Sequence, residues 1–361
     1  MTFRNALMAR LGITIPIIQA PMVGASGTAL AIAASDAGAL GSLAAGALPP
    51  DGILRDAAKI RAETARPFAI NLLMARPANP DVQSVTAAMA RLKSWRDRLG
   101  LPEQAVPNRW SEDFAAQLQA VIAARPAMAS FTFDCLTRDE VAALKAAGIF
   151  VCGTATSVAE ARAWVDAGAD AICAQGAEGG GHRGTFLGEG RADALGTFAL
   201  VPAIRAATTL PLIAAGGIMD GAGIAAALML GADAVQLGTA FLLTPEATTP
   251  QPWRDALAHA GDNDTRLTRV FSGRYARGLE NEFMRKMTPA EKDVPAYPVQ
   301  NALTREIRAA AAKAGNAGLM SLWAGQGVPF IRAMPAGELI STLWAEACEA
   351  SAALHARMAA P

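Results

Sequence analysis

The feature that most restricts the fold of this chain is a regular alternation of short apolar runs with segments of helical spacing. The runs are nearly continuously apolar, as strands buried on both faces are. Eight of them read as strands, at residues 16–22, 39–43, 68–73, 128–133, 150–154, 170–175, 210–215 and 234–241. Helices are expected between them at 28–37, 51–64, 139–147, 158–167, 200–207 and 221–230. Eight such units predict an α/β chain closed as a (β/α)8 TIM barrel, with an open doubly wound sheet as the alternative.

Two regions depart from this repeat. A longer, more polar insertion after the third run carries expected helices at 82–99 and 112–124. Beyond residue 244, prolines and an arginine-bearing polar region precede expected helices at 298–314 and 338–358. We therefore predict a barrel made of residues 1–244 plus 336–361. An additional small helical domain, residues 245–335, would be inserted between the eighth strand and its closing helix and would cap the barrel mouth.

Charge and cysteine content limit the classes of partner. The 32 basic residues balance 32 acidic residues, so no overall field favours nucleic acid or an anionic membrane, and we expect a small-molecule partner. The four cysteines are widely separated and lack CxxC spacing, which argues against a structural zinc site and a disulfide framework. The first residues lack a secretory pattern, so we expect a cytoplasmic protein.

The segment of residues 210–230 is long enough to span a bilayer, and Asp220 is its single charged residue, so a membrane helix has to be considered. Gly216 and Gly217 interrupt the stretch, and an alanine-rich segment follows Asp220. A strand, a turn and a helix explain this pattern better than a membrane helix does.

Polar residues and glycines gather at the carboxyl ends of the expected strands, where TIM barrels carry their sites. The polar positions are Gln19, Asn71, Thr132, Gln175 and Gln236. Glycines end the seventh and eighth strands, in Gly216-Gly217 and in Leu237-Gly238-Thr239, and predict a phosphate cradle. The amides suit the hydrogen-bonding edge of an isoalloxazine, which favours FMN as the cofactor. No lysine at a strand end and no ligand cluster supports Schiff-base or metal chemistry.

One loop stands out for its composition. Residues 174–184 hold five glycines around His182, one of three histidines in the chain. With so few large neighbours in sequence, His182 is expected to pack little, and its ordinary pKa lets it exchange a proton near neutrality. We predict a catalytic or substrate-binding role for His182. His259 and His355 lie in helical sequence and are expected at the surface.

The loop Ala174-Gln175-Gly176-Ala177-Glu178-Gly179-Gly180-Gly181-His182-Arg183-Gly184 resembles the AQGxExGGHRG motif of the nitronate monooxygenases, formerly called 2-nitropropane dioxygenases. The resemblance extends over nearly the whole chain and includes Gln19-Ala20-Pro21-Met22, Asn71-Leu72, Gly153-Thr154-Ala155-Thr156, Ala215-Gly216-Gly217-Ile218, Gln236-Leu237-Gly238-Thr239 and Tyr297-Pro298-Val299-Gln300-Asn301. The chain departs from the family pattern at Thr132, where a second histidine is expected, and at Tyr275, where proline is expected.

The resemblance implies non-covalent FMN and oxidation of an alkyl nitronate by O2 to an aldehyde or ketone and nitrite, without a nicotinamide. His182 would be the catalytic imidazole, and Thr132, Met22 and Tyr297 would contact the substrate. The residues implied for FMN are Gln19, Ala20, Pro21, Met22, Asn71, Gln175, Gly180, Gly181, Gly216, Gly217, Gln236, Leu237, Gly238 and Thr239. A monomer or homodimer is expected. Two alternatives stay open: an NAD(P)H-dependent FMN reductase of a quinone or enoyl thioester, and a non-catalytic flavin-binding protein.

Overall fold

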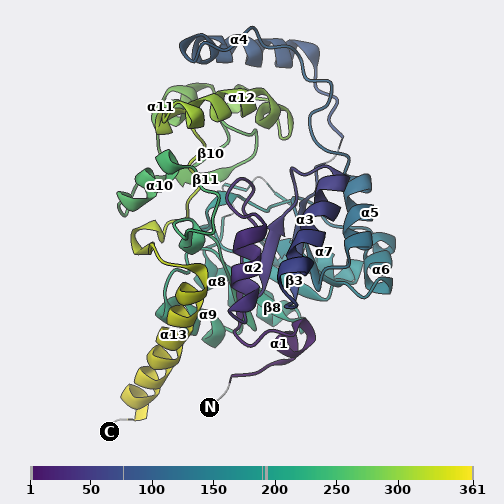
Figure 1. The fold of residues 1–361 in the computed structure, drawn as a ribbon, viewed down its shortest axis with the longest axis vertical. Helices are drawn as coiled ribbons and strands as arrows, with labels where there is room; N and C mark the ends of the chain where they lie inside the picture. The colour runs from purple at the N-terminus through teal and green to yellow at the C-terminus, as the bar shows by residue number, and fades with distance from the viewer. Residues whose placement is uncertain (1–2, 76, 189, 192–193, 360–361) are drawn as a thin grey trace.

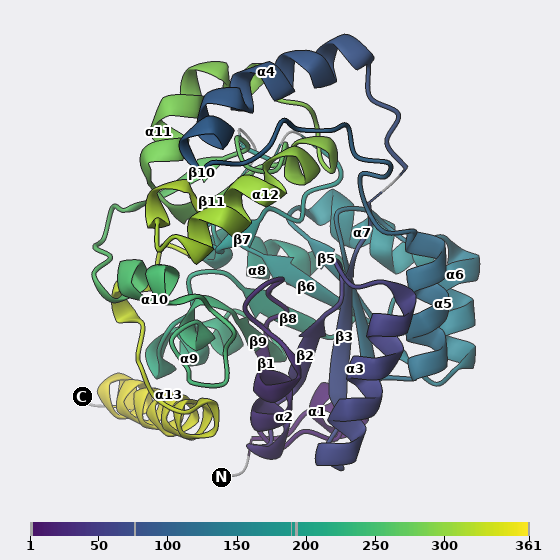
Figure 2. The same cartoon turned by 45° about the horizontal axis from the view of Figure 1, so that its top comes forward.

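The structure is a computed structural model that describes residues 3–75, 77–188, 190–191 and 194–359. Eight parallel strands follow one another in the order β1-β9-β8-β6-β5-β4-β3-β2. A parallel bridge from Ile18 of β1 to Leu40, and a 2.9 Å hydrogen bond from the Gln19 amide to the Leu40 carbonyl, join the two ends of this sheet. The predicted (β/α)8 barrel is confirmed, and the open sheet is excluded (Figures 1 and 2). The barrel strands are β1 (Ile17–Gln19), β2 (Gly41–Ala44), β3 (Phe68–Leu73), β4 (Met128–Thr132), β5 (Phe150–Ala155), β6 (Ala171–Gln175), β8 (Leu212–Ala215) and β9 (Ala234–Leu237).

Helices surround the barrel, each with its apolar face against the strands. Local sequence sets several of their ends: Thr137 and Glu140 form a capping box at the start of α6, and Gly168 ends α7 in the left-handed conformation. The last helix packs against α9 and α2 and completes the ring (Figure 1). These helices are α2 (Thr28–Asp36), α3 (Pro50–Glu63), α5 (Phe114–Ala124), α6 (Arg138–Ala146), α7 (Val158–Ala167), α8 (Thr197–Ala207), α9 (Gly221–Met229) and α13 (Ala336–Ala359).

The structure confirms one prediction about an individual segment and contradicts another. Residues 210–230 form β8, a glycine turn and α9, as predicted, and no helix in the described part of the chain is long and apolar enough to cross a bilayer. The eighth strand was predicted to reach residue 241, and this is wrong: β9 ends at Leu237, and Thr239–Phe241 form a 3-10 turn. The chain leaves the strand direction at Gly238, which precedes this turn at the barrel mouth.

The region predicted as a helical cap contains helices and also a small sheet. Its helices are α10 (Gln251–Ala258), α11 (Glu282–Met287) and α12 (Val299–Lys313). Strands β10 (Thr265–Thr268) and β11 (Ala276–Leu279) pair antiparallel, and β7 (Gly181–His182) adds to β11. The histidine loop is therefore tied to the cap by main-chain pairing. The division of the chain into two domains stays a prediction.

Helix α4 (Val82–Arg98), from the insertion after β3, lies against α12 and above the cap (Figures 1 and 2). Its Leu92 and Trp95 belong to the apolar cluster of the cap, together with Phe271 and Phe283. At the opposite end of the molecule, α1 (Ala6–Leu11) packs Leu7, Met8 and Leu11 onto the bottom of the barrel interior. Because α1 closes that end, a site can open only at the carboxyl ends of the strands, beneath the cap.

Candidate functional site

A cavity of about 480 Å³ lies between the carboxyl ends of the barrel strands and the cap. It is large enough for a cofactor together with a small substrate. The sequence-predicted residues that line it are Ala20, Pro21, Met22, Asn71, Thr132, Gln175, Gly180, Gly181, His182, Gly216, Gly217, Gln236, Gly238, Thr239 and Tyr297. Barrel closure thus brings together residues separated by up to 277 positions in the sequence, which is the separation of Ala20 and Tyr297 (297 − 20).

Two predicted site residues, Gln19 and Leu237, do not reach this cavity. Gln19 is fully buried, and its Oε1 accepts a 2.9 Å hydrogen bond from the Ser42 amide. Leu237 is buried in the cluster between strands and helices. Side chains alternate along a strand, so Ile18 faces the barrel interior while Gln19 faces away from it. The same alternation turns Leu237 outward and Gln236 inward.

The glycines form a cradle with no room for larger residues. Gly216 and Gly217 have φ values of +109° and +74°, a region that side chains disfavour. A Cβ on Gly217 would lie 2.9 Å from Cβ of Glu178. From the cap, Gly325 donates a 2.9 Å hydrogen bond to Thr239 Oγ1, and a Cβ on Gly180 would lie 2.5 Å from the Gly325 nitrogen. Four chain segments therefore pack closely at the cavity, and the glycines leave room for that approach.

The glycine pair Gly325 and Gly327 lines the cavity from the cap but was absent from the predicted site. The two glycines stand close together in the sequence, in Ala324-Gly325-Gln326-Gly327. Nothing in the local pattern brings that stretch to the barrel mouth, so periodicity did not reveal it.

Amide and hydroxyl groups make the cavity floor polar. Asn71 Nδ2 donates to the carbonyl and to the hydroxyl of Ser130, at 3.1 and 3.0 Å. The hydroxyls of Thr132 and Thr154 lie 3.2 Å apart. Gln236 lines the cavity and its side-chain amide makes no hydrogen bond to another described residue. Asn71 Oδ1 and the Gln236 amide are thus the groups available to a ligand with a donor and acceptor edge.

Gln175 has a different task from the predicted one of offering a free amide. Its Oε1 accepts from the Gly184 amide at 2.7 Å, and its Nε2 donates to the His182 carbonyl at 3.0 Å. Arg183 donates to the Gln175 carbonyl at 2.5 Å. Both polar atoms of the side chain therefore hold the histidine loop across the end of β6.

His182 is enclosed by aromatic rings. Its ring centroid lies 5.5 Å from Phe133, 5.8 Å from Tyr297 and 5.5 Å from Trp323. The expectation that this imidazole packs little is wrong, because the rings come from distant segments rather than from its glycine neighbours. This enclosure limits the positions that the ring can adopt.

Hydrogen bonds assign the tautomer of His182. Its Nε2 lies 2.8 Å from the Ser272 hydroxyl, and that hydroxyl donates to the Arg274 carbonyl at 3.0 Å. Since Ser272 has one proton to donate, Nε2 is assigned as the donor in the His182 contact. The unprotonated nitrogen is then Nδ1, which can accept a proton or a hydrogen bond.

The His182 pKa is lowered to about 3, first by burial and then by the positive charges of Arg274 and Arg308. The imidazole is therefore neutral across the physiological range, and the prediction that it titrates near neutrality is wrong. His259 and His355 are exposed, as predicted.

Two arginines on α12 also line the cavity, Arg305 and Arg308. Arg308 donates to the carbonyl and the Oδ1 of Asn301 at 2.8 and 2.9 Å, and its Nε has no hydrogen-bond partner among the described residues. Burial lowers the Arg308 pKa to about 10, so the group stays charged. Among the described residues that line the cavity there is no aspartate or glutamate, which leaves two positive charges for an anionic ligand. Sequence reasoning missed both, because nothing in the helix pattern shows which face meets the barrel.

The chain is similar to a known protein family and to several solved structures. A sequence model of the family described as nitronate monooxygenase matches residues 4–346. A probable nitronate monooxygenase of Staphylococcus aureus is 38% identical over 346 residues, covering 94% of this chain and 96% of that protein. A solved nitroalkane oxidase from Streptomyces ansochromogenes is 41% identical with a TM-score of 0.90, covering 97% of this chain and all of the other. FabK from Thermotoga maritima is 28% identical with a TM-score of 0.78, covering 99% and 100%.

Proposed function

The chain belongs to the nitronate monooxygenase family and is an oxidoreductase, and on that premise we propose that it uses FMN and O2 to convert alkyl nitronates to a carbonyl compound and nitrite. One observation carries the proposal: a neutral histidine and a buried guanidinium line the same cavity as a glycine cradle. An anionic substrate and a phosphorylated cofactor both find matching groups there.

The residues present fit a flavin mononucleotide. Gly216, Gly217 and Gly238 line the cavity without side chains, so their backbone is open to the close approach that a phosphate needs. Asn71 and Gln236 have the amide groups that the edge of the ring system requires. Gln175 lines the same cavity and also holds the histidine loop through its side-chain amide. When bound, the flavin supplies the two-electron redox chemistry and the reaction with O2.

Arg308 would bind the negative charge of the nitronate. Arg308 lines the cavity and has no ion pair among the described residues, so its guanidinium is available to an anion bound there. Phe133, Tyr297 and Trp323 pack around His182 and make this side of the cavity apolar. In the resulting low dielectric, the attraction between guanidinium and anion is stronger than in water.

His182 would act in its neutral form. Its Nδ1 can accept the α-proton of a neutral nitroalkane, which produces the nitronate within the cavity. The guanidinium of Arg308 would stabilise the developing nitronate charge and so offset the weak basicity of an imidazole with a pKa of about 3. With a nitronate supplied from solution no proton needs to be removed, and the ring then orients the substrate. The aromatic neighbours and the Ser272 hydrogen bond hold the imidazole in place for either task.

The test begins with the visible spectrum of the purified protein under argon, followed by addition of propionate-3-nitronate to one cuvette and NADH to another. We expect a bound flavin that is released as FMN on denaturation, reduction by the nitronate, and O2 consumption with nitrite formation in air. Reduction by NADH with no response to the nitronate would support the reductase alternative. A protein without flavin would refute the proposal.

A further inference from the structure

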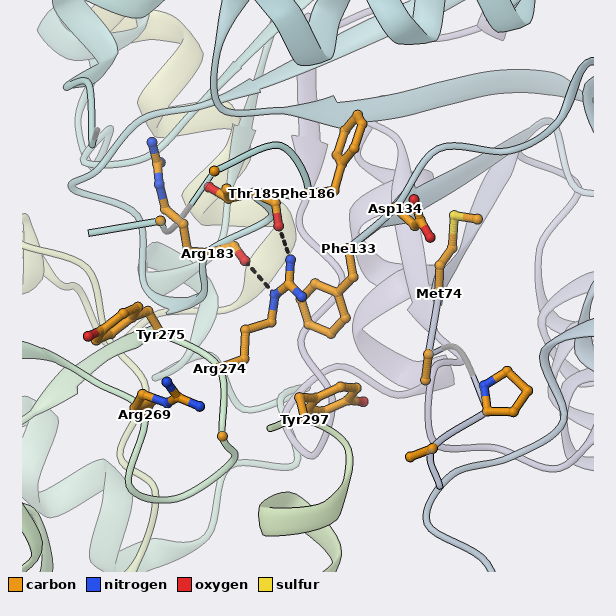
Figure 3. A pocket seen from close by; sticks show the side chains of 16 residues that line it. Met74, Phe133, Asp134, Arg183, Thr185, Phe186, Arg269, Arg274, Tyr275 and Tyr297 are labelled. Carbon is orange, nitrogen blue, oxygen red and sulfur yellow. Dashed lines mark hydrogen bonds between the residues drawn. The ribbon is translucent and has the colours of Figure 1, made fainter. Parts of the chain in front are cut away.

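A second pocket of about 540 Å³ (Figure 3) shares Phe133 and Tyr297 of its lining with the cavity described above. Its walls come from the ends of β3 and β4, from the histidine loop and from cap residues 269–275. Of the predicted site residues only Tyr297 reaches it. The proposed function therefore leaves this pocket without a role.

Among the described residues that line the second pocket, three of the four charged side chains are positive. Arg183, Arg269 and Arg274 line it together with Asp134. Arg269 Nε is buried and has no hydrogen-bond partner among the described residues, and its NH2 makes only a long contact of 3.4 Å with the Val294 carbonyl. Arg269 lines the pocket and has no ion pair among the described residues, so an anion bound there would pair with its terminal nitrogens.

Arg274 also lines the pocket and is held by hydrogen bonds to two backbone carbonyls. Its Nε donates to the Arg183 carbonyl at 3.1 Å and its NH2 donates to the Thr185 carbonyl (Figure 3). Its guanidinium carbon lies 4.2 Å from the centroid of the Phe133 ring. Burial lowers the Arg274 pKa to about 10, so the group is charged but poorly solvated. A fixed, desolvated guanidinium against an aromatic face attracts anions strongly.

The other walls are apolar. Phe133, Phe186, Tyr275 and Tyr297 present rings to the pocket, and Tyr275 is the second position at which the chain departs from the family pattern. Phe133 has a φ of +92°, which is strained for a residue with a side chain. Strained residues persist mainly at functional sites. A ligand that fits both kinds of wall has an apolar or aromatic body and one anionic end.

We propose that this second pocket binds an organic carboxylate, with its carboxylate on Arg269 and Arg274 and its apolar body against Phe133 and Phe186. A free inorganic anion would leave the aromatic walls without contacts, whereas a carboxylate on an apolar body can contact both the arginines and the rings. The occupant would touch Phe133, whose ring centroid lies 5.5 Å from that of His182. This binding needs no turnover, so it stands independently of the proposed function.

The test is titration calorimetry of benzoate into the protein with its flavin bound. Arg269→Met removes the unpaired donor. Arg285→Met, an exposed arginine on α11, is the matched control for loss of a charge. Arg308→Met reports on benzoate bound in the first cavity instead. Losing a charged hydrogen bond weakens binding by roughly ten- to a hundredfold, and we expect that loss in Arg269→Met alone.

The proposal is overturned if wild-type protein binds no benzoate, if Arg269→Met binds as tightly as wild type, or if Arg308→Met is the variant that loses binding. Should Arg269→Met fail to fold, Tyr275→Glu tests the same site, since a carboxylate on this half-buried wall residue repels the ligand. Unchanged benzoate binding in Tyr275→Glu would equally refute the pocket. Failure of nitronate oxidation would refute the proposed function and leave these results standing.

Discussion

Replacing Arg308 by methionine tests the proposed electrostatics of the active site most directly. Methionine keeps much of the apolar length of the side chain and removes the guanidinium. In the structure this deletes an unpaired, buried Nε donor and the two hydrogen bonds to Asn301. It also deletes one of the two positive charges that lower the His182 pKa.

The expected magnitude follows from that geometry. A hydrogen bond to a charged group contributes about 1.5–3 kcal/mol, so kcat/KM for an anionic nitronate should fall roughly 10- to 100-fold. Nitroethane kept in its neutral form has no charge to lose at this position, and its kcat/KM should fall much less. The His182 pKa should rise from about 3, because less positive charge surrounds the imidazole.

The assay is O2 consumption with ethyl nitronate and with neutral nitroethane, combined with a pH profile. Arg285→Met, outside the cavity, is the control for charge loss and should leave both rates unchanged. Arg305→Met removes a cavity arginine that is exposed, so its effect should be smaller. An equal fall for the anionic and the neutral substrate, or no fall for either, would refute a role of Arg308 in recognising the anion.

Three further predictions concern His182 and the glycine cradle. The His182→Asn variant should retain flavin, while its kcat/KM for a neutral nitroalkane should fall by roughly 10²- to 10⁴-fold. Its kcat/KM for a preformed nitronate should fall less. Equal losses for the two substrates would contradict a role of His182 as a base. The folded His182 pKa of about 3 lies below its ordinary 6.5, so the unfolded chain takes up the proton first, and stability should be full above about pH 6.5 and decline toward pH 3. Denaturant titrations should show a weaker decline in His182→Asn than in wild type. The Gly217→Ala variant should lose FMN on dialysis more readily than the Gly148→Ala control. Gly148 has a similar φ of +81°, but a Cβ there would have open space around it. Equal FMN retention in the two variants would contradict the glycine cradle.

Much of the barrel could be predicted from the sequence because its signals are local. Apolar runs of strand length, separated by helical spacing, define parallel strands buried on both faces, and eight of them close a barrel. The position of the cavity followed from the same reasoning, since carboxyl ends of parallel strands meet at one edge. Glycines such as Gly216 and Gly217 were visible because the left-handed backbone that they adopt requires that residue type.

Errors at single positions have a common cause. Gln19 and Leu237 sit at strand ends but point away from the cavity, since side-chain direction reverses with each residue and depends on register. The eighth strand ended early for a related reason, because the turn at Gly238 depends on packing against the rest of the barrel mouth. The local sequence pattern predicts that a strand forms, but it does not predict which of the side chains at the strand end face the cavity.

The sequence by itself determined the barrel, the glycine-rich strand ends and the histidine loop, because periodicity and backbone conformation are properties of neighbouring residues. Only the tertiary structure decided the state of His182, since its aromatic enclosure and its low pKa come from Phe133, Tyr297, Trp323 and two arginines far away in the chain. Burial and charge are sums over everything within a few ångströms, and they exist only after distant segments have packed together.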